Sequence, residues 1–260
     1  MRRTLGFATL AAFVAGCMGT TGGEVVHFDA ALAGPANVVD HALAFTTGRG
    51  LAVRLTKATL VVGAVYMNRA KPIPVSQEKT CILTGSYVGE VLGSASVDLL
   101  SGRPTRFPAG GSGTNEAAVT GELWLSTNDI NATDDTTTIA EVAGEVTLES
   151  GTVPFEGKVS LGANRLPAQT DPARPGAYAP CKARIVTPIP IAVTLEDAGF
   201  LTVRVDPRAW FTTVLFDDLT RDGGVFTFDD GNTNASSIGL AEGVRAAQGV
   251  YAFEWAPRRP

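Results

Sequence analysis

Apolar and polar residues alternate over many short stretches of this chain, which are separated by glycine, proline and acidic turn residues. A period of two is typical of β-strands with one buried face. The predicted strands comprise residues 25–28, 51–65, 86–100, 119–125, 139–148, 153–161, 188–195, 199–205 and 250–255. Helical signals are confined to short segments at 206–211, 217–222 and 235–246. The pattern therefore predicts an all-β fold, a β-sandwich or related barrel, with a few short helical turns.

Two of the connections between strands read as hairpin turns. Glu149-Ser150-Gly151-Thr152 joins the strands at 139–148 and 153–161, and a short turn containing glycine between alternating runs favours an antiparallel pair. The segment 196–199 predicts a second hairpin, between 188–195 and 199–205, whose two prolines favour a sheet edge.

Other connections are predicted as longer loops and one short helix. The glycine-rich segment 110–114 lacks the lysine of a phosphate loop and is predicted to be a turn. Residues 165–180 contain four prolines and are expected to cross the surface as a long loop. Asp206 followed by Pro207 has the pattern of a helix N-terminus, with a capping carboxylate before proline.

The N-terminal segment has the features of a bacterial export signal. Arg2 and Arg3 precede an apolar run from residue 5 to 14, which is too short to span a bilayer. The run ends in Val14-Ala15-Gly16-Cys17, which resembles the lipobox of bacterial lipoproteins. This resemblance covers residues 1–17 and implies that the Cys17 thiol is acylated and becomes the mature N-terminus.

This resemblance divides the chain into three parts: a cleaved signal peptide at 1–16, a lipidated Cys17 with a flexible tether to residue 23, and one folded domain at 24–260. Two or three acyl chains would hold the domain at a membrane. Met18 is not the aspartate that resembles an inner-membrane retention signal, which favours the outer membrane. The alternative is secretion without lipid, with Cys17 left as a thiol. A second alternative divides the folded part into two small sandwiches near residue 165.

The remaining cysteines, Cys81 and Cys181, form an even pair in an oxidising compartment, and we expect a disulfide between them. Closing a loop of about 100 residues stabilises a fold by roughly 4 kcal/mol in the chain-entropy model. The alternative of two soft metal ligands lacks a CxxC motif or a nearby histidine.

The chain has 26 acidic and 21 basic residues and a formal net charge of −5, which argues against nucleic acid as a partner. Its hydrophobic content of 45% is sufficient for a full core.

His27 and His41, the only histidines, lie near Asp29 and Asp40 and could bind zinc or copper if the fold brings them together. Separate surface histidines are the alternative. The oxygen-rich segments 128–135 and 229–234 resemble calcium loops in composition but lack the EF-hand pattern. Asx-rich turns of this kind also form for backbone reasons alone.

Catalytic signatures are weak. No GxSxG elbow occurs, and the acid pairs Asp217-Asp218 and Asp229-Asp230 are typical of solvated turns rather than of glycosidase carboxyls. The segments 204–211 and 250–255 faintly resemble secreted β-sandwich proteins of the methanobactin-associated copper-binding type, but no histidine occurs there to act as a ligand. We expect Trp210 and Trp255 of these segments to be core aromatics.

Together these patterns predict a lipid-anchored bacterial envelope protein that faces the periplasm or the cell surface. We expect a non-enzymatic binding or structural module for an envelope protein or glycan, without a resident cofactor. The alternative function is periplasmic binding of copper or zinc through His27 and His41.

Overall fold

The fold is taken from a computed structural model, which describes residues 23–71, 86–127, 129–132, 134–165 and 180–257. Strands make up 53% of the structure and helices 11%, so the all-β prediction is confirmed. No helix in these ranges is both long and apolar enough to cross a membrane.

The strands, in chain order, are β1 (Val25–Ala33), β2 (Leu43–Thr46), β3 (Ala52–Asn68), β4 (Tyr87–Asp98), β5 (Thr105–Arg106), β6 (Gly111–Thr114), β7 (Ala117–Trp124), β8 (Thr138–Leu148), β9 (Gly151–Ser160), β10 (Ile185–Thr194), β11 (Phe200–Val205), β12 (Thr220–Asp222), β13 (Val225–Phe228) and β14 (Tyr251–Ala256). The helical elements are α1 (Pro180–Arg184), the 3-10 turns η1 (Pro207–Phe211) and η2 (Phe216–Asp218), and α2 (Ala235–Arg245).

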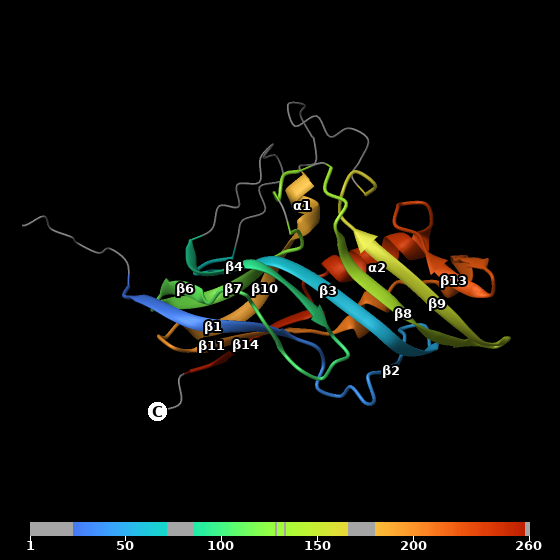
Figure 1. Ribbon diagram of the computed structural model, residues 1–260, viewed down its shortest axis with the longest axis horizontal. Coiled ribbons are helices and arrows are strands. Elements are labelled where there is room, and N and C mark those ends of the chain that lie inside the picture. Colours follow the sequence, from blue (N-terminus) through green and yellow to red (C-terminus); the bar gives the residue numbers. More distant parts are fainter. Residues whose placement is uncertain (1–22, 72–85, 128, 133, 166–179, 258–260) are drawn as a thin grey trace, which may run out of the picture.

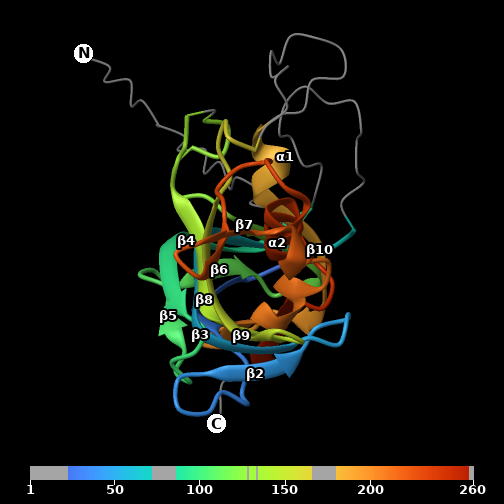
Figure 2. The same ribbon diagram turned by 90° about the vertical axis from the view of Figure 1, so that its right-hand side faces the viewer.

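The long strand β3, which was predicted as a strand at 51–65, organises the sheet. Its first half pairs with β2 and β8, and its second half pairs with β4 and β7. Because β3 changes partners midway, the described strands form one curled mixed sheet, with the order β12-β13-β9-β8-β3-β4-β6-β1-β11-β14 along its main path (Figure 1). Figure 2, viewed at a right angle to Figure 1, shows this curl. Two separate sheets, as a β-sandwich requires, are not distinguished among these strands.

One predicted hairpin is confirmed and the other is wrong. β8 and β9 pair antiparallel along their whole length. β10 instead pairs with β7, whereas β11 pairs in parallel with β1 and antiparallel with β14. The intervening turn binds β1 rather than closing a hairpin, because Asp197 accepts a hydrogen bond from the His27 backbone N–H and the Ala198 N–H donates to the His27 carbonyl. Contacts with a distant strand therefore decided the pairing.

The glycine-rich segment 110–114 is also different from the prediction. Residues Gly111–Thr114 form β6, which pairs with β1 and with β4. A Cβ at Gly111 would lie 2.2 Å from the ring of Phe28, and one at Gly113 would lie 2.4 Å from the Val88 carbonyl oxygen. These glycines serve close packing across the sheet rather than a turn.

The helical elements differ in part from the predicted segments. Asp206 caps η1, as predicted, by accepting a hydrogen bond from the Arg208 backbone N–H. α2 is one continuous helix of 11 residues, where single turns were predicted within 235–246, and Asn234 caps it. A Cβ at Gly243 would come within 2.4 Å of the Trp210 carbonyl oxygen, so close packing on η1 stabilises this helix.

Aromatic side chains fill the core between α2, η1 and the sheet. Phe155 of β9 contacts Phe211, Phe216 and Phe228, with ring centroids 5.2 to 6.0 Å apart. Trp210 is fully buried, and Trp255 packs edge-on against Phe28 with centroids 5.2 Å apart. Trp210 is a core aromatic, as predicted, whereas Trp255 is partly buried and packs against the core.

Candidate functional site

Aromatic and polar side chains gather on the face of β3, β4 and β7 that points away from this core. The acid–aromatic cluster consists of Tyr66, Asn68, Tyr87, Glu122 and Trp124. Tyr66 pairs directly with Glu122 across β3 and β7, and Asn68 pairs with Tyr87 across β3 and β4. Directly opposed residues of antiparallel strands share a face of the sheet. The register therefore brings all five side chains together.

The three rings of the cluster pack in a line. The ring of Tyr66 lies 4.9 Å from that of Trp124 and 5.1 Å from that of Tyr87, measured between centroids. Tyr66 and Trp124 are half-buried, whereas Tyr87 is 44% exposed. The rings therefore form a rim that meets solvent at Tyr87.

Beneath this rim lie polar side chains that are completely buried. Asn68 and Glu122 are both 0% exposed. The Trp124 indole N–H donates a hydrogen bond of 2.5 Å to Glu122 Oε1. Glu122 Oε2, both amide atoms of Asn68 and the Thr187 hydroxyl have no hydrogen-bond partner among the described residues. Each unmet buried group costs about 1–3 kcal/mol, so the site retains hydrogen-bonding capacity that the described residues do not use.

Thr187 belongs to the same region through β10. Its strand neighbour Ile185 pairs with Trp124 and packs beside it. A register shift between Val186 and Ile189 places Thr187 in an irregular part of β10, beside Glu122 of β7. Three adjacent strands, β3, β7 and β10, thus each carry an unsatisfied polar group in this region.

Burial also changes the acid–base behaviour of the cluster. Burial raises the pKa of Glu122 to about 7, against a smaller lowering by the hydrogen bond from Trp124. The pKa of Tyr87 is raised to about 12 by burial and by the negative charges of its neighbours. Burial and the nearby Glu90 and Glu122 raise the pKa of Tyr66. Near neutral pH the Glu122 carboxyl is therefore partly protonated and can donate as well as accept a hydrogen bond, and the phenols keep their protons.

The two histidines proposed as metal ligands lie in different settings. His27 is exposed on β1. His41 is exposed in the turn before β2, with a φ of 55°. The Asp29 carboxylate, which could have joined the histidines in a metal site, forms an ion pair of 2.9 Å with Arg106. Within the described ranges, no group of three or more histidine, cysteine, aspartate or glutamate side chains could hold a metal ion.

Two of the three cysteines lie outside the described residues. These are Cys17, the predicted lipidation site, and Cys81. Cys181 is fully buried in α1 and packs with Ile130 beside Trp124 and Ile185. The disulfide between Cys81 and Cys181 stays a prediction.

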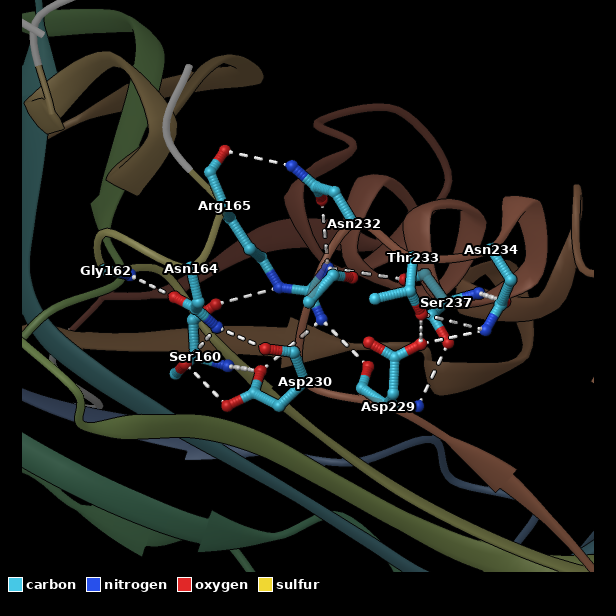
Figure 3. A network of polar contacts seen from close by, with 11 residues as sticks. Ser160, Gly162, Asn164, Arg165, Asp229, Asp230, Asn232, Thr233, Asn234 and Ser237 are labelled. Atoms are coloured by element: carbon cyan, nitrogen blue, oxygen red, sulfur yellow. Dashed lines mark hydrogen bonds and ion pairs between the residues drawn. The ribbon is translucent and has the colours of Figure 1, made fainter. Parts of the chain in front are cut away.

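The acidic segment 229–234 binds a side chain of the protein itself (Figure 3). Asp230 accepts hydrogen bonds of 2.6 and 2.7 Å from the hydroxyl and backbone N–H of Ser160, and it pairs with Arg165 at 3.4 Å. The side chain of Arg165 is 5% exposed, and its guanidinium also donates to the Gly231 carbonyl at 2.9 Å. A buried arginine thus supplies the positive charge that a calcium ion would bring.

The segment 128–135 shows the same arrangement, with residues 128 and 133 outside the described ranges. Arg184 is 0% exposed and donates a hydrogen bond of 2.9 Å to the Ile130 carbonyl. Asp135 accepts hydrogen bonds of 2.9 Å from the Ser126 hydroxyl and the Thr137 N–H. Both oxygen-rich segments are therefore organised around a buried arginine.

The sequence contains one signal for the cluster. Thr120, Glu122 and Trp124 occupy alternate positions of one strand, a pattern that fits the solvent-facing side of a sheet. A glutamate two residues from a tryptophan on one strand face also fits a half-covered binding surface. Which of the two applies depends on residues of β3 and β4, which are distant in sequence.

Comparison of the chain with protein-family models, curated proteins and solved structures gives no match.

Proposed function

We propose that this protein is a lipid-anchored envelope lipoprotein whose β-domain binds a glycan, without chemical conversion, through the acid–aromatic cluster. The observation that carries the proposal is the row of buried polar groups with unmet hydrogen bonds beneath an aromatic rim. Small-molecule sites typically combine apolar and aromatic walls with a few placed polar groups.

The chemistry of the unmet groups matches sugar hydroxyls. A hydroxyl both donates and accepts hydrogen bonds, and the amide of Asn68 and the hydroxyl of Thr187 do the same. The C–H face of a pyranose ring is apolar and packs against the rings of the rim. A site built to hydrogen-bond a hydroxyl discriminates strongly against ligands that lack one. Because the polar atoms are buried, a rim side chain must turn aside on binding, and the exposed Tyr87 is positioned to do so.

The proposal assigns Glu122 a hydrogen-bonding role. The Trp124 indole N–H donates to one of its carboxyl oxygens, and the other oxygen has no partner among the described residues.

The lipid anchor would bring this site close to envelope glycans. Tethering raises the effective concentration of a partner, so that modest affinity suffices. The test of the anchor is the intact mass of the protein purified from membranes of its native host, before and after reduction. A chain that starts at acylated Cys17 and gains two daltons on reduction is expected. A chain without lipid, or without a mass change on reduction, would contradict the anchor or the disulfide, respectively.

Glycan binding is tested by calorimetric titration of the full mature chain with soluble oligosaccharides, N-acetylglucosamine oligomers among them. The variant Asn68→Leu removes two unmet polar atoms at similar volume, and we expect it to weaken binding at least tenfold. Trp255→Phe is the matched control, since Trp255 packs against Phe28 on another part of the sheet. Equal affinities of Asn68→Leu and the native chain, or no heat with any oligosaccharide, would refute the proposal.

A further inference from the structure

The acid–aromatic cluster is one end of a longer line of side chains. The polar row consists of Glu122, Tyr66, Glu90, Ser112 and His27, on β7, β3, β4, β6 and β1 respectively. Each member is directly opposite the next: Glu122 with Tyr66, Tyr66 with Glu90, Glu90 with Ser112, and Ser112 with His27. Opposed residues share a face, so the row crosses five neighbouring strands on one side of the sheet.

Exposure increases steadily along the polar row. Glu122 is buried, the three middle members are half-buried, and His27 is exposed. The opposite face of the same strands is covered by the core, where Met67, Gly89 and Leu195 pack against one another. The row therefore forms an accessible track that begins in the cluster and opens toward β1.

The exposed end of the polar row lies in a surface pocket. This pocket has a volume of about 440 Å³, and His27, Asp29 and Ser112 line it together with the turn at Ala198 and Gly199. Four strand spacings of about 4.8 Å separate β7 from β1, or roughly 19 Å in all. That distance corresponds to a short oligosaccharide and exceeds a single sugar ring.

The charges along the track select against acidic ligands. Glu90 brings a carboxylate to the middle of the row, and Asp197 lies beside His27, where it accepts the His27 backbone N–H at 3.0 Å. Two arginines on these strands or next to them already have acidic partners: Arg106 pairs with Asp29, and Arg69 pairs with Glu116. Hydroxyl, acetamido and amino groups can bind here, whereas a ligand carboxylate or phosphate would meet like charge.

We infer that the ligand is a linear oligosaccharide without acidic groups, which lies along the polar row from the acid–aromatic cluster to the pocket at His27. This inference rests on the proposed function and specifies its substrate class and length. One end of the ligand occupies the cluster, and the hydroxyls of the following sugars contact Glu90, Ser112 and His27 in turn.

The test is a calorimetric titration with N-acetylglucosamine oligomers of two to six units, and with oligogalacturonates of the same lengths as acidic counterparts. We expect affinity to rise at least tenfold from the dimer to the longer neutral oligomers, and to be at least tenfold weaker for the acidic series. His27→Ala and Ser112→Ala should weaken the hexamer several-fold and leave the dimer unchanged. His41→Ala is the matched control, an exposed histidine outside the row, and should change neither.

Three outcomes would overturn the inference, and they are distinguishable from a failure of the proposed function. Affinity independent of length, equal binding of oligogalacturonates, or a hexamer unaffected by both His27→Ala and Ser112→Ala would each refute the extended track. If Asn68→Leu still abolishes binding in those cases, the proposed function stands and the ligand is confined to the cluster. If the native chain binds no oligosaccharide of either series, both proposals fail.

Discussion

Replacing Glu122 by glutamine should change how the stability of this protein depends on pH. The glutamine keeps the oxygen that accepts the Trp124 indole N–H, and its shape is nearly that of glutamate. The substitution removes the ionisation of a carboxyl that is 0% exposed and has one oxygen without a partner among the described residues. Its effect therefore isolates the cost of charging this group inside the fold.

The magnitude follows from the pKa of Glu122, which burial raises from 4.5 to about 7. The unfolded chain loses this proton near pH 4.5, whereas the folded chain keeps it until about pH 7. Between these values the folded state binds more protons, so the free energy of unfolding falls as pH rises. At about 1.4 kcal/mol for each pKa unit, the full loss is about 3 kcal/mol, complete above pH 7. The glutamine variant has no carboxyl at this position and therefore does not lose this stability.

The assay is urea unfolding of the native chain and of Glu122→Gln between pH 4 and pH 8.5, followed by tryptophan fluorescence. All other titrating groups are common to both proteins, so the difference between their free energies of unfolding should shift by about 3 kcal/mol in favour of the variant across this range. Glu145→Gln, at an exposed position of β8, controls for the loss of one charge and should stay within about 0.5 kcal/mol. A flat or opposite difference for Glu122→Gln would refute the reasoning.

Three further predictions concern other parts of the chain. Gly111→Ala should lower the free energy of unfolding by about 1–3 kcal/mol, because the added Cβ would lie 2.2 Å from the ring of Phe28. Gly48→Ala is the control and should change the free energy of unfolding little, because its Cβ would have its nearest contact at 3.8 Å. Thermal melting compares the two variants. Asp230→Ala should lower the free energy of unfolding, measured in urea, by about 3 kcal/mol, because it leaves the buried side chain of Arg165 without its carboxylate partner. If added calcium restored the stability of this variant, this account would be contradicted. Cys17→Ala should move the protein from the membrane fraction to the soluble fraction in its native host, and unchanged membrane recovery would rule out a lipid anchor.

Local patterns were sufficient for much of the fold. Alternation located β3, β4, β7, β8 and β9, because the period of two reports directly on which residues share a face of a strand. The short turn between β8 and β9 and the carboxylate cap of η1 were predictable for the same reason, since each depends on residues a few positions apart. The lipobox resemblance is likewise a local signal, and it concerns residues outside the described part of the chain.

Partner choice was not predictable from such patterns. The strands at 185–194 and 200–205 read as a hairpin, yet hydrogen bonds between residues 197–198 and β1 direct them to different neighbours. The glycines of β6 read as a turn because nothing nearby in sequence shows that the ring of Phe28 occupies the space of a side chain at Gly111. The acidic segment at 229–234 gave no indication that Arg165, more than 60 positions away, neutralises it.

The sequence by itself determined the class of the fold and the positions of most strands, because these depend on contiguous residues. Only the tertiary structure decided which strands meet, and with them the candidate site. Glu122 is an ordinary polar position within its own strand. It becomes a buried acid with a pKa of about 7 because β3 and β4 bring Tyr66, Asn68 and Tyr87 beside it. Side-chain periodicity specifies a face of a strand, but the residues that cover that face come from distant parts of the chain.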